Sequence, residues 1–317
     1  MKVLITGSEG FIGRHLAAEF ARAGYTVVRC DLKEAEGVLP LDILDPERVE
    51  NVLAEEQPDI LVNMAGQANV GLSWKKPQFT FELNTIGLVN ILEAVRKVKK
   101  DMRVIAVGSS DEYGLLLEKG KDVTEDLPVN PLTPYAISKQ AQERFAQLYC
   151  KTYGMNICMT RQFNLGGAGQ AKGFMIADFA SGIAEIENGK RDCLLVGNLT
   201  SARDYTHVKD ACRAIRLIAE KGQAGEIYNI CSGVTHTAQE VLEKLIALST
   251  AEIIVKQDPS RMRPSDTPVI RGNHGKLTAH TGWEAELGLE EILKDALEWW
   301  RKEFNSVIAV TKVPMAL

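Results

Sequence analysis

Short apolar runs alternate with segments of helical periodicity along the first half of the chain. Within residues 14–22, apolar side chains at positions 16, 17, 20 and 21 recur at the spacing of one helix face. Short apolar runs bounded by polar or glycine-containing stretches are typical of buried strands. We expect such strands at residues 3–6, 26–30, 60–63, 103–107, 156–161 and 226–230. This alternation predicts an α/β fold built on a doubly wound parallel sheet.

A long helix is expected over residues 84–100, and its apolar positions cover more than one stripe. A helix with a wet outer face shows an apolar stripe about 100° wide. The second apolar face of this helix is therefore expected to be buried against another surface.

The first predicted strand runs directly into the glycine-rich stretch 7–13, and a helix and a second strand follow it. Glycines here permit a tight turn and let the backbone approach a pyrophosphate, which the free N–H groups of the helix N-terminus then face. Asp31, at the tip of the second strand, can accept hydrogen bonds from an adenosine ribose. This order predicts a Rossmann-type dinucleotide site. Its expected contacts in the turn are Gly7, Gly10, Phe11, Ile12 and Gly13.

The carboxylate of Asp31 favours NAD(H), because it would repel the 2′-phosphate of NADP(H). Arg29 and Lys33 lie nearby in the sequence and soften this preference, so NADP(H) stays possible. Further cofactor contacts are expected where later strands end, because ligands lie at these edges of open α/β sheets. They are Asp42, Ile43, Met64, Ala65, Gly66 and Gln67, with Tyr135 and Lys139 at the nicotinamide end.

Thr133-Pro134 is a helix start, and Tyr135 and Lys139 then lie four residues apart on one face of that helix. A free tyrosine titrates near pH 10, so it is a poor acid–base catalyst at neutral pH. We expect the Lys139 ammonium and an oxidised nicotinamide to lower the pKa of Tyr135 by about 3 units, which takes roughly 4 kcal/mol. Ser109, at the end of a predicted strand, is expected to hydrogen-bond the substrate oxygen and the tyrosine hydroxyl. Ser110 would lie close by.

Several motifs together resemble the extended, sugar-nucleotide branch of the short-chain dehydrogenase/reductase superfamily, over residues 1 to about 303. They are the glycine turn 7–13, GSSDEYG at 108–114, YAISK at 135–139 and RQFN at 161–164. Other stretches are most similar to the GDP-4-keto-6-deoxy-mannose reductases: 67–74, 196–199, 203–204, 229–233 and 258–264. The resemblance implies reduction of a C4 keto group on a GDP-4-keto-6-deoxy-hexose by NAD(P)H.

Relatives of this kind differ in the residues at positions 109–111 according to the reaction that they catalyse. Dehydratases commonly carry Thr-Asp-Glu or Thr-Ser-Glu there, and their glutamate removes the proton next to the keto group. This chain has Ser109-Ser110-Asp111, which favours a reductase, although the shorter Asp111 carboxylate could still act as a base. A 4,6-dehydratase or 4-epimerase with bound NAD is therefore the main alternative. A non-catalytic dinucleotide sensor is a remote one, because Ser109, Tyr135 and Lys139 are all present. The stereochemistry at C4 stays open.

Asn164 and several arginines are the candidates for the nucleotide-sugar diphosphate, because guanidinium groups match phosphate oxygens in pairs. The arginines are Arg203, Arg261 and Arg263. The resemblance further implies a homodimer formed through the helices at 84–100 and 135–151.

The chain has 317 residues, a formal net charge of −5 and no long run of one sign, which argues against nucleic acid as a partner. Its six cysteines show no metal-ligand spacing, and we expect no metal site, free thiols and a cytoplasmic location. We expect no membrane span and no signal peptide. A dinucleotide-binding domain is predicted at 1–163 plus about 204–231. A sugar-nucleotide lobe is predicted at 164–203 and 232–317, with no clear role for the tail 305–317.

Overall fold

A computed structural model describes residues 1–114, 122–261 and 269–311 of the chain, with side chains described as far as residue 305. The chain divides into two compact units. Unit 1 comprises Met1–Phe163, Lys209–Gly233 and Gly272–Glu284, and unit 2 comprises Asn164–Val208, Val234–Arg271 and Ala285–Leu317. Each unit has its own sheet and its own apolar core.

Unit 1 is built on a seven-stranded sheet in the order β10-β6-β5-β4-β1-β2-β3. All neighbouring strands run parallel, as the alternation of strands and helices predicts. The strands are β1 (Lys2–Thr6), β2 (Thr26–Asp31), β3 (Val38–Pro40), β4 (Ile60–Asn63), β5 (Arg103–Ser109), β6 (Ile157–Gln162) and β10 (Ile227–Ile230). The order reverses between β1 and β4, and ligands of open α/β sheets bind at such a point.

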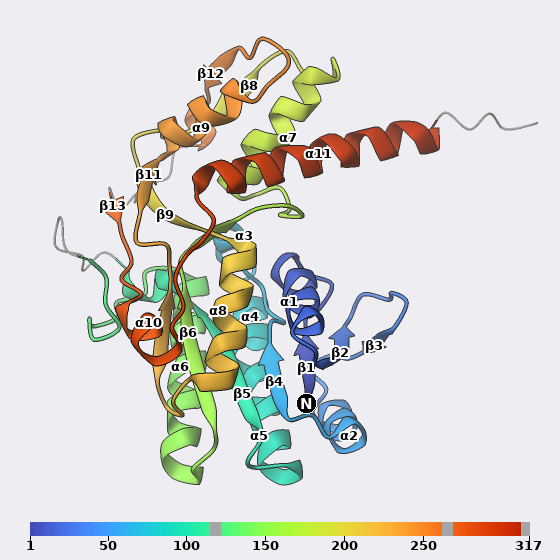
Figure 1. The fold of residues 1–317 in the computed structure, drawn as a ribbon, viewed down its shortest axis with the longest axis vertical. Helices are drawn as coiled ribbons and strands as arrows, with labels where there is room; N and C mark the ends of the chain where they lie inside the picture. Colours follow the sequence, from blue (N-terminus) through green and yellow to red (C-terminus); the bar gives the residue numbers. More distant parts are fainter. Residues whose placement is uncertain (115–121, 262–268, 312–317) are drawn as a thin grey trace, which may run out of the picture. The chain divides into compact units, whose positions relative to one another are not determined.

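Helices cover both faces of this sheet (Figure 1). On one face, α2, α5 and α6 pack over an apolar core in which Leu4, Leu61 and Val104 of the strands meet Ile91 and Ala146 of the helices. On the other face, α1 and α8 lie side by side. The helices of unit 1 are α1 (Phe11–Arg22), α2 (Pro46–Glu56), α3 (Val70–Lys75), α4 (Pro77–Phe81), α5 (Gly87–Val98), α6 (Pro134–Tyr153), α8 (Val208–Lys221, from Lys209 onward in this unit) and α10 (Gly275–Thr281).

Local sequence signals account for several helix ends. The Asp45 side chain accepts a hydrogen bond from Arg48 N at 3.0 Å and caps α2. The Thr133 hydroxyl accepts one from Ala136 N at 3.0 Å and caps α6, as expected.

The helix predicted at 84–100 differs from expectation at its start. A π-helical turn, η1 (Glu82–Ile86), joins α4 directly to α5, so helical backbone begins at Pro77. The side chain of Asn84 lies within this turn and is fully buried. Single-turn π segments are frequent at functional sites, and the contacts of Asn84 are described below.

Unit 2 is smaller and contains a four-stranded sheet and a two-stranded sheet. The first orders β11-β9-β13 with β7 also paired to β9, and the second pairs β12 with β8. Their bounds are β7 (Asn164–Gly166), β8 (Leu194–Val196), β9 (Ala202–His207), β11 (Thr235–Thr237), β12 (Val255–Gln257) and β13 (Val269–Ile270). Three helices, α7 (Met175–Glu187), α9 (Ala238–Ala247) and α11 (Leu289–Thr311), share an apolar core with these strands.

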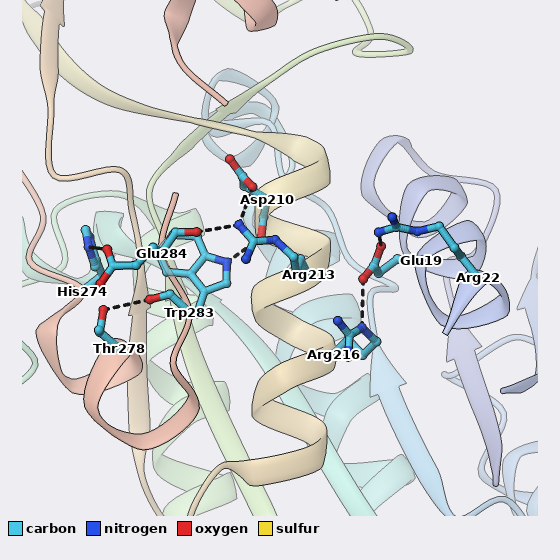
Figure 2. Close-up of polar contacts among 9 residues, drawn as sticks. All are labelled: Glu19, Arg22, Asp210, Arg213, Arg216, His274, Thr278, Trp283 and Glu284. Atoms are coloured by element: carbon cyan, nitrogen blue, oxygen red, sulfur yellow. Dashed lines mark hydrogen bonds and ion pairs between the residues drawn. The ribbon is translucent and has the colours of Figure 1, made fainter. Parts of the chain in front are cut away.

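The predicted division of the chain was wrong for residues 272–284, which were assigned to the second lobe and belong to unit 1. Trp283 explains the difference, because its ring is fully buried and its Nε1 donates to Asp210 O of α8 at 3.1 Å. Figure 2 shows this indole against α8, with Arg213 beside it. The return segment also runs over Lys209–Gly233 rather than 204–231.

Candidate functional site

The turn between β1 and α1 brings backbone close to backbone. Gly7 has a φ of +63°, and a Cβ there would lie 2.7 Å from Ala65 N. A Cβ on Gly13 would overlap the carbonyl oxygen of Gly7. The Gly10 N-cap offers no side chain to the first N–H groups of α1, so Phe11, Ile12 and Gly13 present theirs to a ligand. This cradle fits the pyrophosphate of a dinucleotide, as the sequence predicts.

Asp31 ends β2 beside this turn. One of its carboxylate oxygens accepts Glu9 N at 2.8 Å and the other accepts Lys33 N at 2.9 Å. Each oxygen keeps a further lone pair for a ribose hydroxyl. Two backbone N–H groups therefore fix the orientation of the carboxylate.

Asp42 and Ile43 lie between β3 and α2 and differ in what they can offer a ligand. The side chain of Ile43 is buried in the core against Gly87, so at this position only the backbone is available to an adenine. Asp42 is half-buried, and its carboxylate accepts Leu44 N at 2.9 Å.

The loop after β4 is held by Asn84 of the π-helical turn. Asn84 Oδ1 accepts Gln67 N at 2.8 Å, and its Nδ2 donates to Gln67 O at 3.0 Å. A Cβ on Gly66 would lie 2.8 Å from Asn84 Oδ1 and 3.7 Å from Lys139 Nζ. The loop 64–67 therefore lies against the predicted catalytic lysine. Sequence analysis missed Asn84, because nothing in its local pattern marks it.

The three predicted catalytic side chains lie together in unit 1. Ser109 is the last residue of β5, and Tyr135 and Lys139 lie in the first turns of α6; each is about 8% exposed. The Ser109 hydroxyl lies close enough to the Tyr135 side chain to lower the pKa of the phenol. It also accepts Asp111 N at 3.2 Å at the start of the short 3₁₀ helix η2 (Ser110–Tyr113). Ser110 is half-buried next to it.

Lys139 is held by a second residue of its own helix. Its Nζ donates to Val107 O at 2.8 Å and to Gln142 Oε1 at 3.1 Å. Gln142 Nε2 donates to the same carbonyl at 2.9 Å. Gln142 is buried and lies three residues after Lys139, so the two side chains project together over the end of β5. This positioning residue was not identified from the sequence.

Burial dominates the acid–base character of the pair. Burial raises the pKa of Tyr135 above 10, the negative charge of Asp111 raises it further, and the Ser109 hydroxyl partly offsets these effects. Burial lowers the pKa of Lys139 to about 8, against the opposing attraction of Glu112. Burial outweighs the effect of the ammonium here, because Lys139 donates to Val107 and Gln142 rather than to the phenol. Tyr135 therefore keeps its proton at neutral pH.

A cluster of buried charged residues lies beside Ser109 and fixes its backbone. Glu112 Oε1 accepts Ser109 N at 2.9 Å. Its carboxyl lies 3.9 Å from Arg161, which Glu143 engages through two shorter hydrogen bonds of 2.9 and 2.8 Å. Burial and the charge of Glu143 raise the pKa of Glu112. Glu112 therefore holds a proton near neutral pH while it fixes the backbone of the predicted catalytic serine.

Asn164, Arg203 and Arg261, three of the residues predicted to bind the nucleotide sugar, lie in unit 2. Asn164 is exposed on β7 opposite Tyr205 of β9, and Arg203 lies on β9 with its Nη1 donating to Ala202 O at 2.8 Å. Arg261 closes the 3₁₀ helix η3 (Pro259–Arg261), with its Nε 3.5 Å from Asp258. Arg263 lies outside the described residues.

Arg261 lines a cavity of about 260 Å³ in unit 2. Lys172 and Arg191 line the same cavity, and Glu185 forms ion pairs with both at 2.6 and 3.2 Å. Asp178 lines the cavity as well, so its lining carries three cationic and two anionic side chains. Sequence analysis did not single out Lys172 or Arg191, because they are distant from Arg261 along the chain and surrounded by ordinary surface residues.

The described part of the chain contains no group of three or more His, Cys, Asp or Glu side chains that could hold a metal ion. Within the same residues no helix is long and apolar enough to cross a membrane.

A parallel sheet with a glycine turn, together with Ser109, Tyr135 and Lys139 around one strand end, defines an NAD(P)-dependent enzyme of the extended short-chain dehydrogenase/reductase type. The chain belongs to the GDP-mannose 4,6 dehydratase family, whose model matches residues 4–296.

Two curated relatives span nearly the same length. The chain is 32% identical to the GDP-6-deoxy-D-mannose reductase of Pseudomonas aeruginosa, over 94% of this chain and 97% of the relative. It is 28% identical to the GDP-6-deoxy-D-talose 4-dehydrogenase of Aggregatibacter actinomycetemcomitans, over 94% and 98%.

Among solved structures, the protein RMD of Pseudomonas aeruginosa complexed with NADPH matches with a TM-score of 0.86 and 31% identity. The match covers 95% of this chain and 99% of that one. The UDP-glucose 4-epimerase of Thermus thermophilus in complex with NAD matches with a TM-score of 0.86 and 27% identity, over 95% and 99%. Structural relatives thus bind either cofactor.

Proposed function

We propose that this chain reduces the C4 keto group of a GDP-4-keto-6-deoxy-hexose, with NAD(H) favoured and NADP(H) possible. The glycine cradle of β1 and α1 and the loop 64–67 would hold the dinucleotide, with Asp31 on the adenosine ribose. The names of the reductase and dehydrogenase relatives support a GDP-linked 6-deoxy sugar as the substrate.

The side chains divide the work of carbonyl reduction. Bound reduced nicotinamide supplies the hydride. Tyr135 donates its proton to the oxygen on which charge develops, and the Ser109 hydroxyl polarises that oxygen. Lys139 is held beneath the loop 64–67, where its ammonium can orient the nicotinamide ribose.

One observation carries the proposal: the Tyr135 phenol is buried beside Ser109 at the end of β5, and burial raises the pKa of the phenol, so that it can serve as an acid. A reductase needs an acid at this place. A dehydratase also needs a base next to the keto group. Asp111 stands where dehydratases carry glutamate, and its side chain is exposed and one methylene shorter, which disfavours that role.

Tyr135→Phe tests the assignment directly. We expect kcat for the oxidation of NAD(P)H by the keto sugar to fall at least 100-fold, in line with the loss of a general acid. Tyr153→Phe, at the other end of α6, is the matched control and should retain activity. If Tyr135→Phe turns over within tenfold of the parent, the acid is another group.

The diphosphate would lie in unit 2. Arg203, Arg261 and Arg263 are the proposed phosphate ligands, Asn164 offers an amide to the phosphate or the sugar, and Ser110 joins Ser109 at the reacting sugar. The position of Arg261 in the lining of the unit 2 cavity, together with Lys172 and Arg191, supports this assignment.

We also propose a homodimer formed through α5 and α6. Apolar side chains on α6 lie exposed at helical spacing: Ile137, Phe145 and Leu148, the last 52% exposed. On the segment that leads into α5, Phe79, Phe81 and Ile86 are exposed as well. Light scattering of the parent should give twice the chain mass at micromolar concentration. The Leu148→Glu variant should give the mass of a single chain. A single-chain mass for the parent would refute this dimer.

A cytoplasmic location is part of the same proposal. All six cysteines are free, which fits a reducing compartment.

A further inference from the structure

Glu9 occupies the third position of the glycine turn, and its side chain is only 10% exposed. Its carboxylate lies between two arginines of unit 1. Oε2 is 3.5 Å from Arg14 Nε, and Oε1 is 3.3 Å from Arg29 Nη1. Arg14 follows the last glycine of the turn on α1, and Arg29 lies on β2, two residues before Asp31. One carboxylate therefore forms ion pairs with two guanidinium groups beside Asp31.

The backbone of Glu9 has a separate task. Its N–H donates to Asp31 Oδ2 at 2.8 Å, so the residue fixes the carboxylate that faces the adenosine ribose. The side chain thus lies at the end of the site where NAD and NADP differ. That difference is one phosphate group on the ribose 2′-oxygen.

We propose that the Glu9 carboxylate determines the preference for NAD(H) over NADP(H) by holding Arg14 and Arg29 in ion pairs. Guanidinium groups bind phosphate oxygens through paired, charge-assisted hydrogen bonds. With Glu9 in place, a 2′-phosphate must displace a carboxylate that is already bound to both arginines, and it meets Asp31 as well. With Glu9 neutral, the same arginines become available to the phosphate.

The proposal rests on dinucleotide binding alone and not on the sugar substrate. It is therefore tested with two nucleotides that lack the nicotinamide, adenosine 2′,5′-bisphosphate and AMP, by calorimetric titration of the full chain. Glu9→Gln keeps the side-chain volume and leaves the backbone N–H bond to Asp31 intact. The affinity for AMP, which lacks the 2′-phosphate, reports whether the ribose site is preserved.

Glu19→Gln is the matched control. Glu19 lies on the same helix, also between two arginines, with Arg22 and Arg216 on either side (Figure 2). It lies in the last turn of α1, away from the glycine turn, so it removes the same charge at a different place.

We expect Glu9→Gln to bind adenosine 2′,5′-bisphosphate at least tenfold more tightly than the parent, because a charge-assisted contact is gained. AMP affinity should stay within threefold, and Glu19→Gln should change neither. The ratio of NADP⁺ to NAD⁺ dissociation constants should move in the same direction. Adding Arg29→Gln to Glu9→Gln should abolish the gain.

An unchanged bisphosphate affinity in Glu9→Gln would overturn the proposal, as would an equal gain for AMP or a gain that survives Arg29→Gln. Should Glu9→Gln fail to fold, Arg14→Gln and Arg29→Gln in the parent decide the matter. Because Glu9 already engages both arginines, each change should leave bisphosphate affinity within threefold. A loss of tenfold or more would show that the arginines already bind the phosphate.

Discussion

Gln142 should control the pH range in which the enzyme works. Its Oε1 accepts a hydrogen bond from the Lys139 ammonium at 3.1 Å in a buried site, and burial has already lowered the pKa of Lys139 to about 8. Gln142→Met removes this acceptor while Val107 O still holds the lysine. A hydrogen bond to a charged group contributes about 1.5–3 kcal/mol, and about 1.4 kcal/mol corresponds to one pKa unit. The pKa of Lys139 should therefore fall to about 7.

This shift has a measurable consequence for the rate. If the ammonium form of Lys139 is the active one, activity declines as the pH rises through its pKa. At pH 7.5 the protonated fraction drops from roughly three quarters to one quarter, so kcat/KM should fall about threefold. At pH 6 the two enzymes should be nearly equal.

The assay is kcat/KM for NAD(P)H oxidation between pH 5.5 and 10. Gln142→Glu should move the decline above pH 8, because a carboxylate beside the ammonium favours its charged form. Gln147→Met, on the same helix and in an exposed hydrogen bond, should behave as the parent. A decline at the same pH in the parent and in Gln142→Met would refute the positioning role of Gln142.

Three further predictions concern the supporting residues. Glu112 holds a proton in the folded chain up to about pH 8 but ionises near 4.5 when unfolded, so the parent loses stability as the pH rises through this window. Glu112→Gln cannot titrate, and its free energy of unfolding relative to the parent should rise by about 3.5 kcal/mol from pH 5 to pH 8 in urea titrations; a constant difference would contradict the raised pKa. Gly13→Ala places a methyl group against the Gly7 carbonyl oxygen. We expect it to lower the free energy of unfolding by about 1–3 kcal/mol and to weaken NAD⁺ binding. An unchanged melting temperature would contradict this, because it would show that the turn accommodates the methyl group. Arg261→Gln should raise KM for the nucleotide sugar about tenfold with kcat within twofold, because a charge-assisted phosphate contact is lost; an unchanged KM would place the phosphate elsewhere.

The fold of unit 1 was predictable because its signals are local. The glycine turn, the N-caps Asp45 and Thr133 and the short apolar runs each act over a few residues, and the structure has strands and helices at the expected places. The boundary of unit 1 was not predictable, because the burial of Trp283 against α8 joins segments about 70 residues apart.

The same distinction holds for the site. Tyr135 and Lys139 follow from their spacing on one helix, and Ser109 from its strand end. Asn84 and Glu112 were not predicted as site residues, because each is hydrogen-bonded to a backbone N–H group that lies beside it only in the folded chain. The burial that raises the Tyr135 pKa is a property of the packed site, so it could not be read from the sequence.

The stoichiometry of cofactor use tests the central claim most directly. The full chain is mixed with a measured amount of GDP-4-keto-6-deoxy-mannose and excess NADH or NADPH, and absorbance at the wavelength of the reduced cofactor is followed to completion. The account predicts one reduced cofactor oxidised per keto sugar consumed, with a GDP-6-deoxy-hexose as the product. Turnover of GDP-mannose or another GDP-hexose without added cofactor and without net oxidation would contradict it and identify the chain as a dehydratase or epimerase.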